Sequence, residues 1–135
     1  MKKICDQIRR CHVFPTIEGL VDDRTLALGA LANAAIAANG EFKIALAGGR
    51  TPLKLYQQLV ALNTDWSRWV IYFGDERCLP RGDSDRNDTA ARDVWPNHVA
   101  IPAVQIHAIP SELGADAGAL AYIEQLKAAG QFDLV

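Results

Sequence analysis

Residues 43–51 read KIALAGGRT and residues 69–77 read WVIYFGDER, and these two stretches decide the fold. In each of them a short, mostly apolar run ends at glycine and is followed by polar residues. Such runs are typical of buried strands. Because residues 69–73 are apolar at every position, they predict a strand covered on both faces, as in a parallel sheet. We expect residues 43–47 to form a strand of the same sheet.

Helical patterns lie before and after the first of these strands. Apolar residues recur at helical spacing over residues 17–36, and Gly40 supplies a stop, so we predict one long amphipathic helix there. A second helix is predicted directly after the first strand, with Thr51 as its N-terminal cap and Pro52 in its first turn. The chain therefore begins in the order helix, strand, helix, strand.

The second half of the chain continues this alternation. Its predicted elements are a helix carrying residues 90–95, a short strand over residues 104–109, an Ala-rich helix over residues 113–129 and a further strand from residue 132. The Ala-rich helix is expected to face inward with Leu120, Ile123 and Leu126. The predicted fold class is α/β, a doubly wound, mostly parallel sheet of the Rossmann-like type, in one domain over residues 1–135.

The composition excludes some classes of protein and favours others. A chain of 135 residues with 50% hydrophobic and 22% charged residues has the profile of a globular domain. Its net charge of −2 gives no overall field for nucleic acid or an anionic membrane. No apolar stretch of signal or membrane-spanning length follows the basic start, and the three cysteines form no CxxC pair. We therefore expect a cytoplasmic protein with no nucleic-acid or membrane partner.

The first candidate binding segment is the loop Gly48-Gly49-Arg50-Thr51, at the predicted carboxyl end of a strand. In open α/β sheets, ligands collect beyond that end, where helix N-termini point. Two residues without Cβ let an anion approach the backbone, and Arg50 and the Thr51 hydroxyl add possible contacts to a phosphate. Taken alone, the loop is equally well explained as a tight turn before a capped helix.

The second candidate is Asp75-Glu76-Arg77, which directly follows the predicted buried strand and Gly74. A carboxylate and a guanidinium at a strand end can orient hydroxyl groups and neutralise a developing oxyanion. Taken alone, this loop is better explained as a salt-bridged surface loop. Two such loops on consecutive strands, each at the carboxyl end, favour instead a sugar phosphate or a similar anionic ligand.

The segments IALAGGRTPLKLY (44–56), VIYFGDERCLP (70–80) and DRNDTAARDVW (85–95) resemble the 6-phosphogluconolactonase family in order and spacing. The wider superfamily, which includes glucosamine-6-phosphate deaminase/isomerases, shares the Gly-Gly-x-Thr-Pro loop and the Asp-Glu pair, whereas Arg77 is typical of the lactonase branch. The resemblance implies hydrolysis of 6-phospho-D-glucono-1,5-lactone to 6-phosphogluconate in the oxidative pentose phosphate pathway. It also implies that the reaction needs no metal or organic cofactor.

The resemblance further implies roles for individual residues. Those that would hold the phosphate are Gly48, Gly49, Arg50 and Thr51. At the lactone end, Asp75 would orient the substrate, Arg77 would stabilise negative charge, and Asn87 would close the pocket. Arg50 and Arg86 stand where the family commonly has serine.

One element that the resemblance implies has no counterpart in the sequence. Family members continue after the segment matching residues 132–135 into a Gly-rich loop whose histidine acts as general acid and base. We therefore expect a single incomplete domain, truncated before its carboxy-terminal part and inactive on its own. For His12, His98 and His107 a surface or structural role is the better interpretation.

Two other functions stay open. The first is a glucosamine-6-phosphate deaminase or isomerase, in which Asp75 would abstract a proton from carbon. The second is a non-catalytic sugar-phosphate sensor, which would need no general base. The sequence gives no indication of the oligomeric state.

Overall fold

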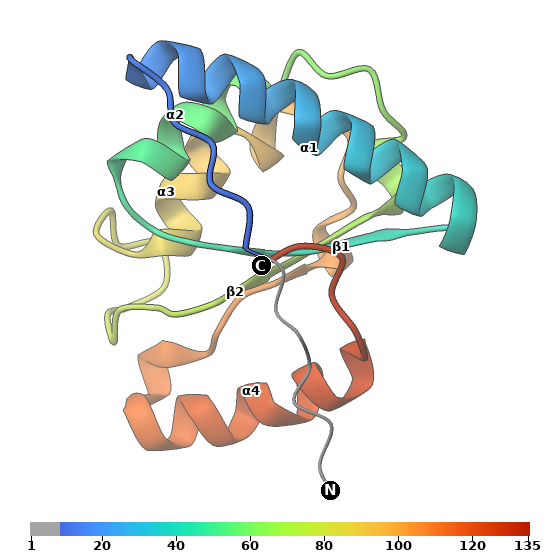
Figure 1. Cartoon of the computed structure of the whole chain (residues 1–135). Coiled ribbons are helices and arrows are strands. Elements are labelled where there is room, and N and C mark those ends of the chain that lie inside the picture. Colours follow the sequence, from blue (N-terminus) through green and yellow to red (C-terminus); the bar gives the residue numbers. More distant parts are fainter. Residues whose placement is uncertain (1–8) are drawn as a thin grey trace, which may run out of the picture.

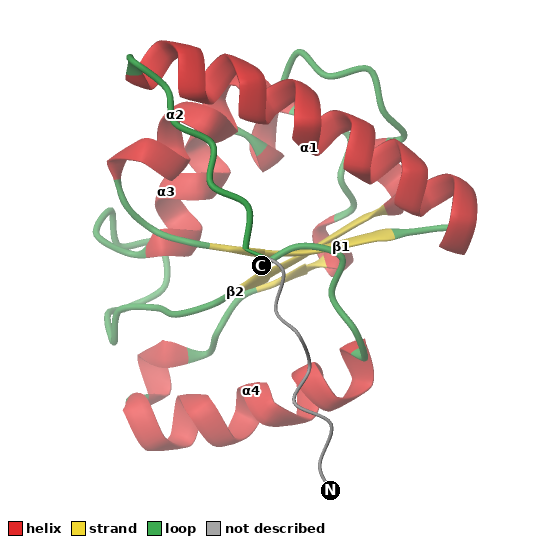
Figure 2. Ribbon diagram, viewed as in Figure 1, coloured by secondary structure: helices red, strands yellow, loops and turns green. Residues whose placement is uncertain are grey.

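The computed structural model describes residues 9–135, in which a short parallel sheet lies between two helical layers (Figure 1). The basic residues Lys2 and Lys3 and the thiol of Cys5 lie outside the described residues. In chain order the main elements are α1 (Ile17–Asn39), β1 (Phe42–Leu46), α2 (Arg50–Leu59), β2 (Trp69–Phe73), α3 (Asn87–Val94), β3 (Ile106–His107) and α4 (Ala115–Ala129). Helices α1, α2 and α3 cover one face of the sheet, and α4 covers the other (Figure 2). Within residues 9–135, every helix is too short or too polar to span a membrane.

The sheet has the order β1-β2-β3, and all of its strand pairs are parallel. β1 pairs with β2 along its whole length, and β2 pairs with β3 at Ile71 and Ile106. On its other side β1 forms an isolated parallel bridge between Ile44 and Leu134. The predicted parallel α/β sheet is therefore confirmed, and both long strands begin and end within one residue of the prediction.

The third strand is shorter than the predicted range of residues 104–109. Residues Ala103–Gln105 form a 3-10 helix instead, which ends directly before β3. The side-chain amide of Gln105 donates to the carbonyl oxygens of Ser67 (2.9 Å) and Trp69 (2.8 Å). At this end of β2 a side chain therefore makes the hydrogen bonds that a paired strand would otherwise make. The pattern of apolar residues does not predict such a contact.

Two helix ends show where cap prediction succeeds and fails. α1 ends as predicted, because Gly40 adopts a positive φ of 83° and its N–H donates to the carbonyl of Ile36. The predicted cap at Thr51 is wrong, since α2 already begins at Arg50. Gly49, with a φ of 105°, occupies the cap position and turns the chain from strand to helix at once.

The main core lies between the sheet and the layer of α1, α2 and α3. Trp69 and Trp95 are fully buried there, with ring centroids 5.6 Å apart, and Trp66 packs 4.7 Å from Trp69. These rings pack against one another and against Phe42 inside the fold. The tryptophans are therefore core residues.

Helix α4 contacts the opposite face of the sheet with an unexpected side. Leu120 (68% exposed), Ile123 (42%) and Leu126 (36%) are largely open to solvent, so their predicted inward orientation is wrong. The buried residues of α4 are small or aromatic, namely Gly118, Tyr122 and Ala129. A Cβ at Gly118 would lie 2.8 Å from the carbonyl oxygen of Pro110, so this close approach requires glycine. The backbone contact at Gly118 therefore sets the rotation of the helix.

Tyr122 joins α4 to the ends of two strands, and its removal tests that attachment. Its hydroxyl accepts from the N–H of Phe73 (2.9 Å) and donates to the carbonyl of His107 (3.0 Å). We expect Tyr122→Phe to lower the free energy of unfolding by about 1–3 kcal/mol, because both backbone groups lose a buried partner. Urea denaturation measures the effect, with Leu120→Ala on the exposed side of α4 as the control that stays near wild type.

The same tyrosine makes the stability depend on pH. Burial raises the pKa of Tyr122 from 10.0 to about 12. Because the folded-state pKa is the higher one, the neutral phenol stabilises the fold fully below pH 10, and this contribution is lost as the pH rises through 12. The difference in unfolding free energy between wild type and Tyr122→Phe should therefore shrink from pH 10 to pH 12. A difference that stays constant over that interval would contradict the assignment.

Candidate functional site

The loops that follow β1 and β2 border one hollow of about 850 Å³. The first loop contributes Gly49 and Arg50, and the second contributes Glu76 and Arg77. Asn87, the first residue of α3, completes this side of the lining. The arrangement expected from parallel strands is therefore present, and two guanidinium groups lie in one concavity beside the N-terminus of α2.

Asn87 connects the two loops. Its side-chain amide donates to both the carbonyl oxygen (3.2 Å) and the carboxylate (3.1 Å) of Asp75. On the other side, a Cβ at Gly48 would lie only 2.2 Å from the Asn87 Oδ1 atom, so the first loop fits against this amide because Gly48 has no side chain. Asp75 itself is exposed and touches the site through Asn87.

Glu76 supports the start of α3, a role that the sequence analysis missed. Its carboxylate is fully buried and accepts from the backbone N–H groups of Asn87 (2.6 Å) and Asp88 (2.8 Å). The first N–H groups of a helix have no partner inside the helix and favour a negative charge. The sequence offers one indication of this role. An arginine side chain, such as that of Arg86 at the N-cap position, cannot accept a hydrogen bond, so another residue must accept from the first N–H groups of the helix.

Arg86 is the second residue whose role the sequence did not reveal. It is 1% exposed, and its guanidinium donates to Asp88 (2.8 Å), to Glu112 (3.2 Å) and to the carbonyl oxygens of Leu79 (3.0 Å) and Ile109 (3.1 Å). Burial opposes the charged form, but the hydrogen bonds that Arg86 donates to Asp88 and Glu112 outweigh it and hold the pKa of Arg86 above its usual range. The guanidinium is therefore charged and makes four hydrogen bonds inside the fold.

Arg77 and Arg50 differ from Arg86 in being exposed. The backbone of Arg77 is fixed from two sides, since its N–H donates to Glu76 (2.8 Å) and its carbonyl accepts from the Ser111 hydroxyl (2.8 Å). Arg50 lies in the first turn of α2. The two side chains line the hollow from anchored backbone positions, which suits them to contact an anion there.

Like Gly48 and Asp75, Thr51 lies outside the lining of this hollow. It lines a separate, mainly apolar hollow of about 240 Å³ together with Pro52 and Tyr56. The reason is that α2 begins two residues earlier than a Thr51 cap requires. The backbone N–H of Thr51 still belongs to the first turn of the helix, which the loop presents toward the larger hollow.

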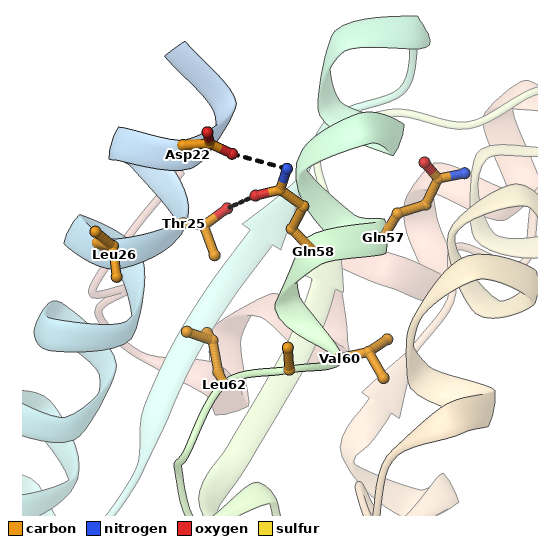
Figure 3. Close-up of a pocket in the computed structure, with 8 residues that line it drawn as sticks. Asp22, Thr25, Leu26, Gln57, Gln58, Val60 and Leu62 are labelled. Atoms are coloured by element: carbon orange, nitrogen blue, oxygen red, sulfur yellow. Dashed lines mark hydrogen bonds between the residues drawn. The ribbon is translucent and has the colours of Figure 1, made fainter. Parts of the chain in front are cut away.

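A further hollow, of about 680 Å³, lies between α1 and α2 (Figure 3). Its polar side chains bond to one another, because Gln58 donates to Asp22 (2.9 Å) and accepts from the Thr25 hydroxyl (3.3 Å). None of the predicted site residues lines it. We therefore place the functional site in the hollow between the two strand loops.

The histidines of the chain lie outside the lining of that hollow. His107 stacks on Tyr72 with ring centroids 4.5 Å apart, and the His98 ring nitrogen contacts the carbonyl of Asp93 at 2.7 Å. His12 is exposed ahead of α1. The structural interpretation of His98 and His107 thus agrees with their surroundings.

The fold and this hollow define an α/β protein whose candidate ligand site lies at the carboxyl ends of parallel strands. The sequence profile described as "Glucosamine-6-phosphate isomerases/6-phosphogluconolactonase" matches residues 15–135, and the chain belongs to this family. It is 38% identical over 125 residues to a 6-phosphogluconolactonase of Mycobacterium bovis, covering 87% of this chain and 50% of that protein. A 6-phosphogluconolactonase of a Nostoc species is 37% identical over 102 residues, covering 71% and 42%.

A solved structure supports the same assignment. The 6-phosphogluconolactonase of Thermotoga maritima superposes with a TM-score of 0.79 at 25% identity, over 84% of this chain and 53% of that one. The chain thus spans about half the length of the relatives it matches.

Gly48→Ala tests whether the Asn87 amide packs between the two loops. The added Cβ would overlap the Asn87 amide, so we expect the amide to leave Asp75 and the free energy of unfolding to fall by about 1–2 kcal/mol. Gly74→Ala is the matched control, because its Cβ would meet only the Leu46 carbonyl at an ordinary 3.6 Å. In an Asn87→Ala background the cost of Gly48→Ala should disappear, and a cost that persists would contradict this packing.

Proposed function

We propose that this chain forms the substrate-binding part of a 6-phosphogluconolactonase, which hydrolyses 6-phospho-D-glucono-1,5-lactone to 6-phosphogluconate in the pentose phosphate pathway. The observation that carries the proposal is the single hollow that Arg50, Arg77 and the start of α2 share. Its two guanidinium groups suit a ligand with a phosphate at one end and a polarised ester carbonyl at the other. The relatives named 6-phosphogluconolactonase support the same choice.

The phosphate would lie against the loop before α2. Gly49 leaves the backbone open to an anion, while Gly48 lies against the Asn87 amide. The N–H groups of the first helical turn, that of Thr51 among them, offer donors aligned with the helix dipole. Arg50 adds a charged donor from the same turn. In this proposal the Thr51 contact is made by the backbone, since its side chain borders another hollow.

The lactone would lie toward the second loop. Nucleophilic attack by water converts the ester carbonyl into an oxyanion, and the Arg77 guanidinium would stabilise that charge. Asp75 would orient the substrate hydroxyl groups, and Asn87 would close the pocket between the two loops. No step assigned to these residues requires a metal ion or an organic cofactor.

The attacking water needs a general base, and the resemblance implies that a histidine provides it. Among the residues described, no histidine lines the hollow. We therefore propose that the 135-residue chain binds substrate and product but does not by itself accelerate hydrolysis. A cytoplasmic location without nucleic-acid partners is part of this proposal, supported by the free thiols of Cys11 and Cys78 and by the net charge of −2.

The amino-sugar alternative rests on the shared family, whose description covers both activities. The arginine after Asp-Glu favours the lactone, because an oxyanion gains more from Arg77 than an ammonium-bearing substrate does. A sensor without catalysis would use the same hollow, and turnover by a longer protein carrying this sequence would exclude it.

Calorimetric titration tests the proposed site directly. We expect 6-phosphogluconate to bind the chain in the micromolar to millimolar range, more tightly than glucosamine 6-phosphate. Arg50→Gln and Arg77→Gln should each weaken binding about tenfold to a hundredfold, which corresponds to the roughly 1.5–3 kcal/mol of a charge-assisted contact. Arg68→Gln, an exposed arginine at the opposite end of β2, is the control and should bind like wild type.

A parallel assay of lactone loss completes this test. The chain should leave the spontaneous rate of hydrolysis unchanged. Catalysis by the chain alone would show that a residue of the described hollow acts as the base. An Arg77→Gln variant that binds 6-phosphogluconate as tightly as wild type would contradict the proposed contact between Arg77 and the oxyanion.

A further inference from the structure

We propose that Arg86 is a positioning residue for the site and that it acts through Asn87. Arg86 borders the hollow but is only 1% exposed, and it fixes the segment that carries Asn87 between the two loops. The expected effect on 6-phosphogluconate binding rests on the proposed function. The effect on the position of Asn87 does not, because it is a property of the ligand-free chain.

First, Arg86 forms hydrogen bonds with segments that are separate in the sequence. Its guanidinium contacts the carbonyl oxygen of Leu79 in the second loop, the carbonyl of Ile109 beyond β3 and the carboxylate of Glu112. A fourth bond reaches Asp88 in α3. Arg86 therefore fixes the far wall of the hollow to the end of the sheet, at a point that solvent does not reach.

The second step is the link from Arg86 to Glu76. The Glu76 carboxylate is fully buried and lies 4.0 Å from the Arg86 Nε atom. A buried carboxylate is unfavourable unless charges and donors compensate it, and Arg86 supplies the cation while α3 supplies the N–H groups. With Arg86 removed, the buried Glu76 carboxylate would lose this cation, and its bonds to α3 would weaken.

The third step leads from Glu76 to the ligand side of the pocket. Glu76 holds the backbone N–H of Asn87 at 2.6 Å, and Arg86 is the residue directly before it. The Asn87 amide then reaches Asp75 and packs against Gly48. A shift at the start of α3 therefore moves the Asn87 side chain, which lies between the loop after β1 and the loop after β2.

Arginine suits this task through its geometry. Its planar guanidinium offers five donors in a fixed fork, and four bonds from it reach acceptors in three segments of the chain. Arg81 provides a control for the loss of a positive charge near the site. Glu112 accepts from Arg86 with one carboxylate oxygen and from the exposed Arg81 with the other. Removal of Arg81 leaves every bond of Arg86 in place.

The test uses the 135-residue chain with NMR and calorimetry. In wild type the side-chain amide signals of Asn87 should be shifted and slow to exchange, unlike those of the exposed Asn97. Arg86→Gln should move them to values like those of Asn97 and weaken 6-phosphogluconate binding about tenfold. Because the effect runs through Asn87, the double variant with Asn87→Ala should bind no more weakly than Asn87→Ala alone.

Matched variants keep the test decisive if Arg86→Gln does not fold. Glu112→Gln removes one partner of Arg86 and should shift the Asn87 signals and weaken binding about threefold, whereas Arg81→Gln should change neither. Leu28→Ala, in the core away from the hollow, controls for loss of stability alone and should leave the Asn87 signals and affinity unchanged.

The outcomes separate this inference from the proposed function. Unchanged Asn87 signals in Arg86→Gln and Glu112→Gln, or additive losses in the double variant, would overturn the positioning role. If wild type bound neither 6-phosphogluconate nor inorganic phosphate, the proposed function would fail, and the Asn87 signals of the ligand-free variants would still decide the role of Arg86.

Discussion

The site depends on one buried carboxylate, that of Glu76, which holds the first N–H groups of α3. Burial of that charge is tolerable because the helix N-terminus and the Arg86 guanidinium both lie against it. Through this contact, a loop that leaves β2 is joined to a helix that begins ten residues after Arg77. Without it, Asn87 would have no fixed place between the loops.

The parallel sheet provides the frame for this contact. Because β1 and β2 run side by side in register, their carboxyl ends stop together and both following loops emerge at one edge. Gly48 then lets the first loop approach the Asn87 amide, and Gly49 turns the chain into α2 without delay. The pocket is therefore a consequence of strand register together with two residues that lack Cβ.

Much of this arrangement could be predicted from the sequence, for physical reasons. Apolar runs bounded by glycine specify β1 and β2 to within a residue, and periodicity specifies α1, because both signals are local. The inward face of α4 could not be predicted, since a backbone contact at Gly118 and the reach of Tyr122 set its rotation. Such contacts exist only once distant segments have come together.

The same distinction holds for the site. The glycine loop and Asp75-Glu76-Arg77 could be found because each follows a strand, and their residue types indicate anion binding. Arg86 could not, since in the sequence it is one arginine in a polar stretch, and its four partners come from three segments. Thr51 illustrates the converse, because its side chain has suitable chemistry but points to another hollow when the helix begins two residues earlier than expected.

A crystal structure of the chain with 6-phosphogluconate bound tests the central claim most directly. The account predicts the phosphate within hydrogen-bonding distance of the N–H groups at the start of α2 and of Arg50, with the carboxylate end near Arg77 and Asn87. A ligand seated instead in the hollow between α1 and α2, or one that contacts only one of the two loops, would contradict it.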